Sequence, residues 1–213
     1  MKLLDTTGGN TKIAKTQALT SGIRLAQLSL HPDNELCPGS KAAECIDDCL
    51  LYSGLAAVYD SVNEARARKS EFFKTDESGF LEQLRRELHN FLKLCAKLGL
   101  TPWVRLNVLS DVAWEKYGIP EEFPDLNLYD YTKRAARLLK VPSNYHLMFS
   151  YSGASKYHNQ VLKAFETGVP IAAVFRGPMP ETFLGRDVVN GDRSDLLNLS
   201  QPGKIIGLKA KGP

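Results

Sequence analysis

Three cysteines within thirteen residues are the side chains of this sequence with the clearest capacity for chemistry. Cys37, Cys45 and Cys49 follow the spacing C-x7-C-x3-C, whereas the fourth cysteine, Cys95, stands apart in an amphipathic helical pattern. An odd cluster of thiols is a poor disulfide framework and a better set of metal ligands, because thiolates bind both iron–sulfur clusters and zinc. The spacing therefore predicts that these three cysteines hold a metal.

The kind of metal stays open, and three interpretations fit the cysteine cluster. An iron–sulfur cluster held by three cysteines would leave one iron available to a ligand, which suits catalysis. Zinc would need a fourth ligand, and His31 is the nearest histidine in the sequence. In the third interpretation the thiols are small buried side chains that bind no metal.

A second group of polar side chains recurs where apolar runs of the sequence end. The predicted catalytic residues are Asp130, Asn107 and Lys133. The predicted cofactor-binding residues are Ser110, Asp111, Ser150, Arg176 and Lys209. Helix capping is an alternative role for Asp111. Because the carboxyl ends of parallel strands gather on one face of an α/β barrel, we expect these side chains to share one site.

Short apolar runs alternate with helical patterns, and these elements must position the polar residues. Strands are expected at 22–30, 103–109, 126–131, 145–150, 170–176 and 204–210. Helices are expected at 59–73, 79–98, 132–139 and 155–167, with a short helix after 110–111. Strands separated by helical crossovers predict a single α/β domain over residues 1–213, with a mainly parallel sheet.

Within the α/β class, the sequence favours a (β/α) barrel, closed or partial, over a doubly wound sheet. GxGxxG and GxxxxGK[ST] are absent from the sequence, so it lacks the dinucleotide and phosphate-loop fingerprints that are typical of doubly wound sheets. The polar strand ends fit a barrel, with the cysteines at its mouth. The segment 177–194 is rich in Gly, Pro and Asp and could form a lid over that mouth.

Composition narrows the classes of function. With 43% hydrophobic and 24% charged residues, the chain has the balance of a soluble globular protein. The sequence has no stretch near the roughly 18 to 20 apolar residues that a bilayer span requires and no secretory signal, so we expect the cytoplasm of a host cell. A net charge of +3 is too small to indicate a dedicated nucleic-acid-binding domain.

Short motifs are spread along almost the whole chain. They include Gly8-Gly-Asn-Thr-Lys12, the three clustered cysteines, Arg66-x-Arg68-Lys69, Val104-Arg-Leu-Asn107, Tyr129-Asp-Tyr-Thr-Lys133 and Gly207-Leu-Lys-Ala-Lys211. Together these motifs resemble a bacteriophage and plasmid family called gene product eighty-eight. The resemblance implies a phage or plasmid origin and specifies no reaction.

The order of a strand, a three-cysteine loop, a helix and a strand ending in Leu109-Ser110-Asp111 is similar to a second phage family, which has radical-SAM-like cysteines. This likeness implies a four-iron cluster and S-adenosylmethionine as cofactors, although radical-SAM proteins usually have the spacing C-x3-C-x2-C. The predicted function is an iron–sulfur enzyme acting on a small-molecule, nucleotide, nucleic-acid or protein substrate. The alternative is a non-catalytic phage accessory protein, zinc-binding or metal-free, that binds a host protein or nucleic acid.

Overall fold

The structure, a computed structural model, describes residues 1–6, 17–26, 36–46 and 59–210. Its strands are β1 (Leu4–Thr6), β2 (Ala18–Ile23), β3 (Thr101–Arg105), β4 (Asn127–Thr132), β5 (Tyr145–Ser150), β6 (Ile171–Phe175), β7 (Thr182–Phe183), β8 (Arg186–Asn190) and β9 (Ile205–Lys209). Its α-helices are α1 (Asp60–Thr75), α2 (Glu77–Leu98), α3 (Ile119–Glu122), α4 (His158–Glu166) and α5 (Asp195–Leu199). Short 3-10 helices are η3 (Trp114–Tyr117), η4 (Ala135–Leu138) and η5 (Ser155–Tyr157).

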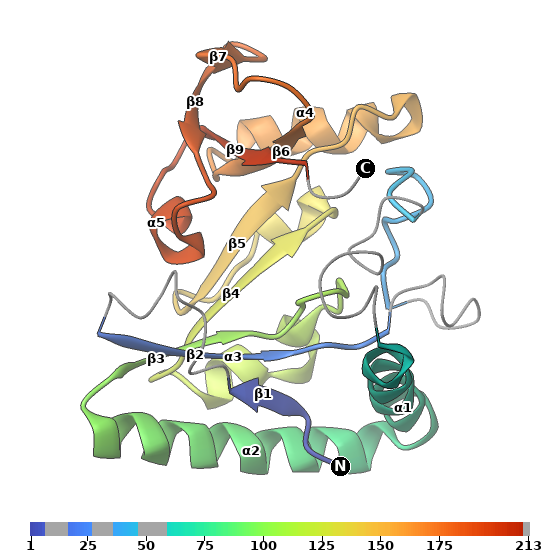
Figure 1. Ribbon diagram of the computed structural model, residues 1–213, viewed down its shortest axis with the longest axis vertical. Helices are drawn as coiled ribbons and strands as arrows, with labels where there is room; N and C mark the ends of the chain where they lie inside the picture. The colour runs from blue at the N-terminus through green and yellow to red at the C-terminus, as the bar shows by residue number, and fades with distance from the viewer. Residues whose placement is uncertain (7–16, 27–35, 47–58, 211–213) are drawn as a thin grey trace.

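The described strands form one sheet in the order β1-β2-β3-β4-β5-β6-β9-β8-β7. Pairing is parallel from β2 across to β8, while β1 and β7 pair antiparallel with β2 and β8. The sheet twists strongly, from β2 and β3 at the bottom of Figure 1 to β6 and β9 at its top. The predicted α/β class with mainly parallel strands is therefore confirmed.

The sheet is open, because β1 and β7 are its two outer strands and do not pair with each other within the described ranges. The described strands thus do not form the closed version of the predicted barrel. From β2 to β6 the strands follow one another in chain order. That order is typical of the wall of a (β/α) barrel, whereas a doubly wound sheet changes direction at a switch point.

Helix α2 shows why the predicted elements form. Its buried side chains recur every three or four residues and face the sheet: Phe80, Leu84, Leu88, Phe91 and Cys95. The helix begins where the Asp76 carboxylate accepts a hydrogen bond from the Gly79 amide, and it ends at Gly99 in the left-handed region. Among the described helices, none combines the length and apolar character that crossing a membrane requires.

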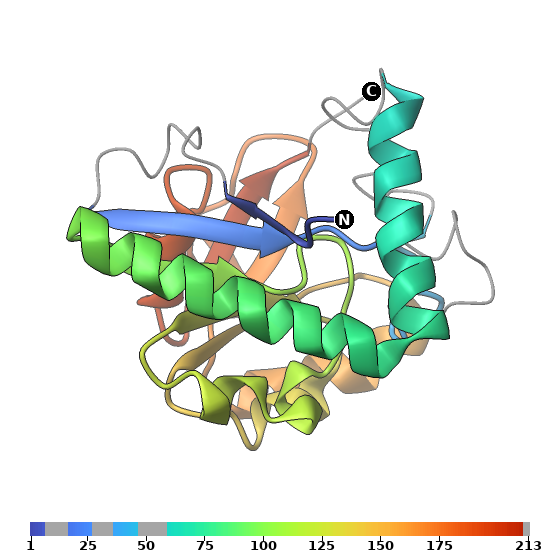
Figure 2. The ribbon, with the colours of Figure 1, turned by 90° about the horizontal axis from the view of Figure 1, so that it is seen from below.

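The helices cover the two faces of the sheet unequally. The large core contains Phe73 of α1, Ile119 of α3 and Val161 of α4 together with the α2 stripe. A smaller cluster of Met148, Ala172 and Ile206 lies on the other face, where Leu199 of α5 packs against it. Figure 2 shows α1 and α2 meeting end to end at a large angle, with α2 running alongside β2. One face is thus thickly covered, and the other is largely left to α5.

Several predicted elements differ from the structure. The strand predicted at 103–109 ends at Arg105, and the helix predicted at 132–139 is the short 3-10 helix η4. The first parallel strand is 18–23 rather than 22–30, because the chain leaves the sheet after Ile23 and the Ala26 amide donates to the Ser70 hydroxyl of α1 at 2.6 Å. Residues 27–30 of that predicted strand lie outside the described residues. The segment 177–194, predicted as a lid, contains the hairpin of β7 and β8. That hairpin extends the sheet beyond β9.

Candidate functional site

The cysteine loop, residues 36–46, lies against the carboxyl end of β3. The amide of Asp111 donates to the Leu36 carbonyl oxygen at 2.7 Å. The Cys37 thiol donates to the carbonyl oxygen of Leu109 at 3.3 Å. These two contacts join the start of the loop to the segment that follows β3.

The middle and far end of the cysteine loop contact the residues that follow β4 and β5. The Ser152 hydroxyl, two residues beyond β5, donates to the Ala43 carbonyl oxygen at 2.7 Å. At Gly39 a Cβ atom would lie 2.9 Å from the Cβ of Lys133, so glycine allows a close approach that a side chain would obstruct. The described part of the loop therefore contacts the residues that follow three neighbouring strands, β3, β4 and β5.

Cys45 lies near Tyr157, which in turn contacts the main chain of Lys133. Its half-buried thiol donates to the Ser40 carbonyl oxygen at 3.7 Å. Burial, and then the negative charges of Asp111 and Cys45, raise the pKa of Tyr157. The Tyr157 hydroxyl donates to the Lys133 carbonyl oxygen at 2.6 Å, so Tyr157 lies near both Cys45 and Lys133.

Lys133 reaches from the end of β4 to the end of β5. Its ammonium group donates to the Ser150 hydroxyl at 3.1 Å and lies 5.6 Å from the centre of the Tyr157 ring. The structure thus brings four predicted residues to one edge of the sheet, namely Cys37, Cys45, Lys133 and Ser150. Cys49 and His31 lie outside the described residues, and within the described ranges no three His, Cys, Asp or Glu side chains group as a metal site.

The predicted catalytic pair Asn107 and Asp130 also comes together, but in the protein interior. Asp130 is 0% exposed, and its carboxylate accepts hydrogen bonds from the Asn107 amide at 2.7 Å and side-chain nitrogen at 2.9 Å. The Tyr145 hydroxyl donates to the same carboxylate at 2.5 Å. A catalytic role for this pair remains a prediction, and the contacts show that it joins β3, β4 and β5 on the helix-covered face.

Asn107 is the centre of a buried network of hydrogen bonds. Its side-chain oxygen accepts from the Ser110 hydroxyl at 2.8 Å, the Val112 amide at 2.8 Å and the Trp114 indole at 3.1 Å. One amide side chain therefore fixes the whole turn from β3 into η3. Ser110, predicted to bind a cofactor, is one of the donors in this turn.

Asp111 pairs with arginine and does not cap a helix. The helix that follows it, η3, has Ala113 at its N-cap position. The Asp111 carboxylate lies 2.5 Å from the Arg137 guanidinium and accepts from the Thr132 hydroxyl at 3.1 Å and the Lys133 amide at 3.0 Å. Asp111 thus fixes the main chain that carries Lys133, so its role is to position a residue of the site edge.

Arg176 and Lys209 lie further along the sheet than the other predicted residues. Both are exposed, at the carboxyl ends of β6 and β9. Ser150 pairs with Ala172 in the register of β5 and β6, and Arg176 is four residues beyond that level. At about 3.3 Å per residue this is a separation of about 13 Å along the strand. These two cations therefore stand apart from the cluster around the cysteine loop.

Asp130 makes the free energy of unfolding depend on pH. Burial raises its pKa to about 6, although the hydrogen bond from Tyr145 and the charge of Arg137 lower it. An aspartate in the unfolded chain titrates near pH 4. The contribution of Asp130 is therefore complete below about pH 4 and is lost as the pH rises through about 6, because the fold then contains a buried charge.

Replacing Asp130 by asparagine is expected to remove this pH dependence. Between about pH 4 and pH 6.5, the wild-type protein should lose about 2 kcal/mol of unfolding free energy relative to Asp130→Asn. Urea denaturation of both proteins across this range measures the difference. Asp125→Asn, which alters an exposed carboxylate, is the matched control. An offset from wild type that does not vary with pH would contradict the raised pKa of Asp130.

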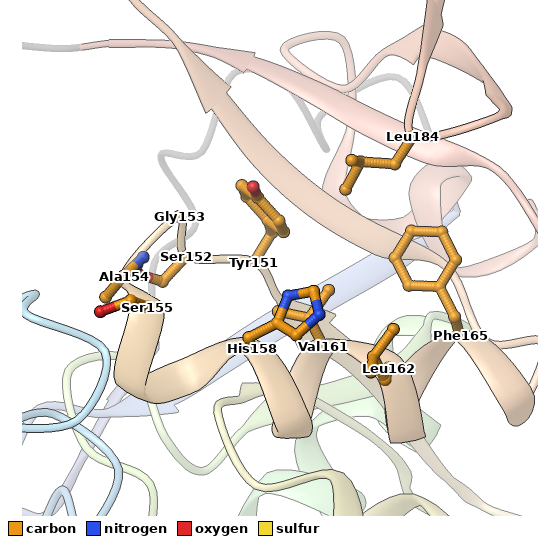
Figure 3. Close-up of a pocket in the computed structure, with 10 residues that line it drawn as sticks. All are labelled: Tyr151, Ser152, Gly153, Ala154, Ser155, His158, Val161, Leu162, Phe165 and Leu184. Carbon is orange, nitrogen blue, oxygen red and sulfur yellow. Dashed lines mark hydrogen bonds between the residues drawn. The ribbon is translucent and has the colours of Figure 1, made fainter.

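A pocket of about 630 Å³ beside the end of β5 was missed by sequence reasoning. Figure 3 shows its lining, which comes from the β5–α4 connection, α4 and the β7–β8 hairpin: Tyr151, Ser152, Gly153, Ala154, Ser155, His158, Val161, Leu162, Phe165 and Leu184. His158 looks like an ordinary surface histidine in the sequence. In the sequence, the one feature that could have indicated the pocket is the pair Leu184-Gly185, in which a bulky apolar residue precedes a glycine at a tight turn.

Comparison with known proteins identifies a family and no closer relative. No curated protein matches the chain, and no solved structure matches it. One family model, described as Gene product 88, matches residues 1–213, which is the whole sequence. The family that the sequence motifs indicate is therefore confirmed, and this chain belongs to the Gene product 88 family.

Proposed function

We propose that the protein is a phage-encoded iron–sulfur enzyme of the radical-SAM type, built on an open, partial (β/α) barrel. In this proposal Cys37, Cys45 and Cys49 hold a four-iron cluster. The main support is the position of the cysteine loop, which follows β2, the first strand of the parallel series. Its described part lies on the carboxyl ends of β3, β4 and β5. That edge of a parallel sheet is where α/β enzymes build their sites.

The described cysteines fit a thiolate-ligated cluster by their chemistry. Cys37 and Cys45 are both half-buried residues of the site edge. Each thiol donates a weak hydrogen bond to a main-chain carbonyl, of Leu109 and Ser40 respectively. Ligation requires the thiolate, so metal binding would exchange these two weak hydrogen bonds for sulfur–metal bonds.

Lys133 is the described side chain best placed to act beside the cysteine loop. When bound, a cluster with three cysteine ligands supplies an open iron and the electron for reductive cleavage of S-adenosylmethionine. The Lys133 ammonium can bind a carboxylate or phosphate. Ser150 holds that ammonium at the end of β5. We propose that Lys133 binds an anionic group of the cofactor or substrate.

The exposed cations at the ends of β6 and β9 favour an anionic substrate. Arg176 follows β6, and Lys209 ends the neighbouring strand β9, where it pairs with Phe175 in the sheet register. They stand apart from Lys133 on the carboxyl side of the same sheet, so together the three cations suit an extended anion. A nucleotide or a nucleic-acid phosphate fits this distribution of charge, so we propose these substrate classes ahead of a neutral small molecule.

Anaerobic purification tests the proposal directly. We expect a brown protein with a broad absorption band near roughly 400 nm and about four irons per chain. With S-adenosylmethionine and dithionite, the reconstituted protein should release 5′-deoxyadenosine. A protein that contains the cluster and releases none would contradict the radical-SAM assignment while leaving the iron–sulfur site intact.

Finding zinc in the same anaerobic preparation would support the alternative function. A colourless anaerobic preparation with one zinc per chain would contradict the iron–sulfur proposal and identify the cysteine loop as a structural site. The protein would then be a non-catalytic accessory protein, whose partners would be sought among host proteins and nucleic acids. Preparations that contain neither metal would show that Cys37 and Cys45 serve packing alone.

A further inference from the structure

The pocket beside β5 has an apolar end and a polar end. Leu162, Phe165 and Leu184 form the apolar end, from α4 and the β7–β8 hairpin. Ser152 and Ser155 lie toward the other end, in the connection before α4, and His158, the first residue of α4, lies between the two ends (Figure 3). A concave site of about 630 Å³ with this division is in the range of small-molecule binding sites.

Aromatic rings surround much of this space. Tyr151, His158 and Phe165 all line it, and Leu184 projects over it from the opposite side (Figure 3). The Tyr151 ring is held in place by an edge-on contact with Phe183, with 5.2 Å between ring centres. Rings prefer offset-stacked or edge-to-face partners, so this lining suits a planar ring better than a long flexible chain.

Leu184 is held in a conformation that its residue type disfavours. Its φ is +50° and that of Gly185 is +76°, as in a two-residue hairpin turn of type I′. Asparagine or glycine is preferred at the first of these positions, and leucine there is strained. The Leu184 side chain is also 51% exposed. The hairpin would form more readily without leucine at this position. The strained leucine therefore suggests a role in binding a ligand rather than in forming the turn.

Arg186 holds the hairpin at a fixed distance from α4. Its guanidinium donates to the Phe165 carbonyl oxygen at 2.6 Å and lies 4.3 Å from the centre of the Phe165 ring. The two walls that carry Leu184 and Phe165 are therefore joined by one side chain. This contact keeps the pocket formed before any ligand arrives, which reduces the entropy lost on binding.

We propose that this pocket binds a small planar aromatic or heteroaromatic molecule that carries a hydrogen-bonding group. The ring lies between Leu184 and the side chains of Tyr151 and Phe165. The hydrogen-bonding group faces Ser155 and His158. The site needs neither the cysteines nor a metal, so it goes beyond the iron–sulfur proposal and can be tested on metal-free protein.

Titration with indole, a planar ring with one N–H donor, tests the site by methyl NMR of leucine-labelled protein. We expect saturable shifts of the Leu162 and Leu184 methyl signals, with Leu139 and Leu197 unchanged. Those two leucines are 73% and 59% exposed and do not line the pocket. The absence of shifts up to the solubility limit of indole, or equal shifts at all four leucines, would overturn the proposal.

Leu184→Asn separates binding from folding. Asparagine suits the turn, so the melting temperature should stay equal or rise. Loss of the apolar contact should weaken indole binding about fivefold or more. Leu162→Gln, an exposed helical position at which glutamine is well tolerated, should weaken binding similarly. Leu139→Asn is the control and should leave binding unchanged. Unchanged binding by both pocket variants would overturn the proposal.

Discussion

Replacing Cys45 by alanine is expected to lower the iron content of anaerobically prepared protein from about four atoms per chain to less than about one. Cys37→Ala and Cys49→Ala should have the same effect, because a cluster with only three cysteine ligands has none to spare. Formation of 5′-deoxyadenosine should be lost together with the iron. Iron analysis and the absorption near roughly 400 nm measure these changes.

Cys95→Ala is the matched control for the cysteine series. Cys95 is 1% exposed on the core-facing stripe of α2, and burial raises the pKa of its thiol. We expect this variant to keep its iron and to lose only some thermal stability. Circular dichroism of every variant checks that the fold is retained. If folded Cys37→Ala and Cys45→Ala proteins keep the wild-type iron content, the proposed metal site is wrong.

Replacing Arg137 by methionine is expected to lower the free energy of unfolding by about 3 to 5 kcal/mol. Its side chain is only 4% exposed and lies 2.5 Å from the Asp111 carboxylate. Two of its nitrogens donate to the Glu115 carboxylate, both at 2.8 Å, and a third contact at 3.0 Å reaches the Tyr145 hydroxyl. Methionine fills most of the volume but leaves a buried carboxylate without its main cation.

Urea denaturation measures this loss, and Arg85→Met is the control. Arg85 also pairs with a glutamate, Glu122, at 2.6 Å, but both side chains are more than a third exposed, 35% for Arg85 and 38% for Glu122. Such surface pairs contribute about 0 to 1 kcal/mol. A loss for Arg137→Met no larger than that for Arg85→Met would show that the buried network does not stabilise the fold.

The helices and strands whose apolar residues recur at a regular spacing could be predicted from the sequence. The strand at 145–150 has the predicted bounds, and α2 begins only two residues before the predicted start. The strands β1 and β7 have three and two residues, too few to show alternation. The end of β2 depends on Ser70, a residue of α1 that is distant in sequence, so no local pattern could place it.

The candidate site was predictable in position and less so in its contacts. A cysteine loop after a strand is expected at the carboxyl edge, and Cys37, Cys45 and Lys133 do lie there. The burial of Asp130 depends on Tyr145, which meets it only when β5 pairs with β4. A polar residue at a strand end looks the same in the sequence whether it lies in a ligand site or in the buried core. Long-range pairing therefore decides whether it faces a ligand or the core.

The short outer strands of the sheet bear on how the protein behaves at high concentration. An open sheet exposes unpaired main-chain groups at its edges, and long flat edges are templates for pairing with other chains. In the described part of this sheet, the outermost strands are β1, with three residues, and β7, with two. Both run antiparallel to their neighbours and stop early. The sheet can therefore remain open without presenting a long template for edge-to-edge aggregation.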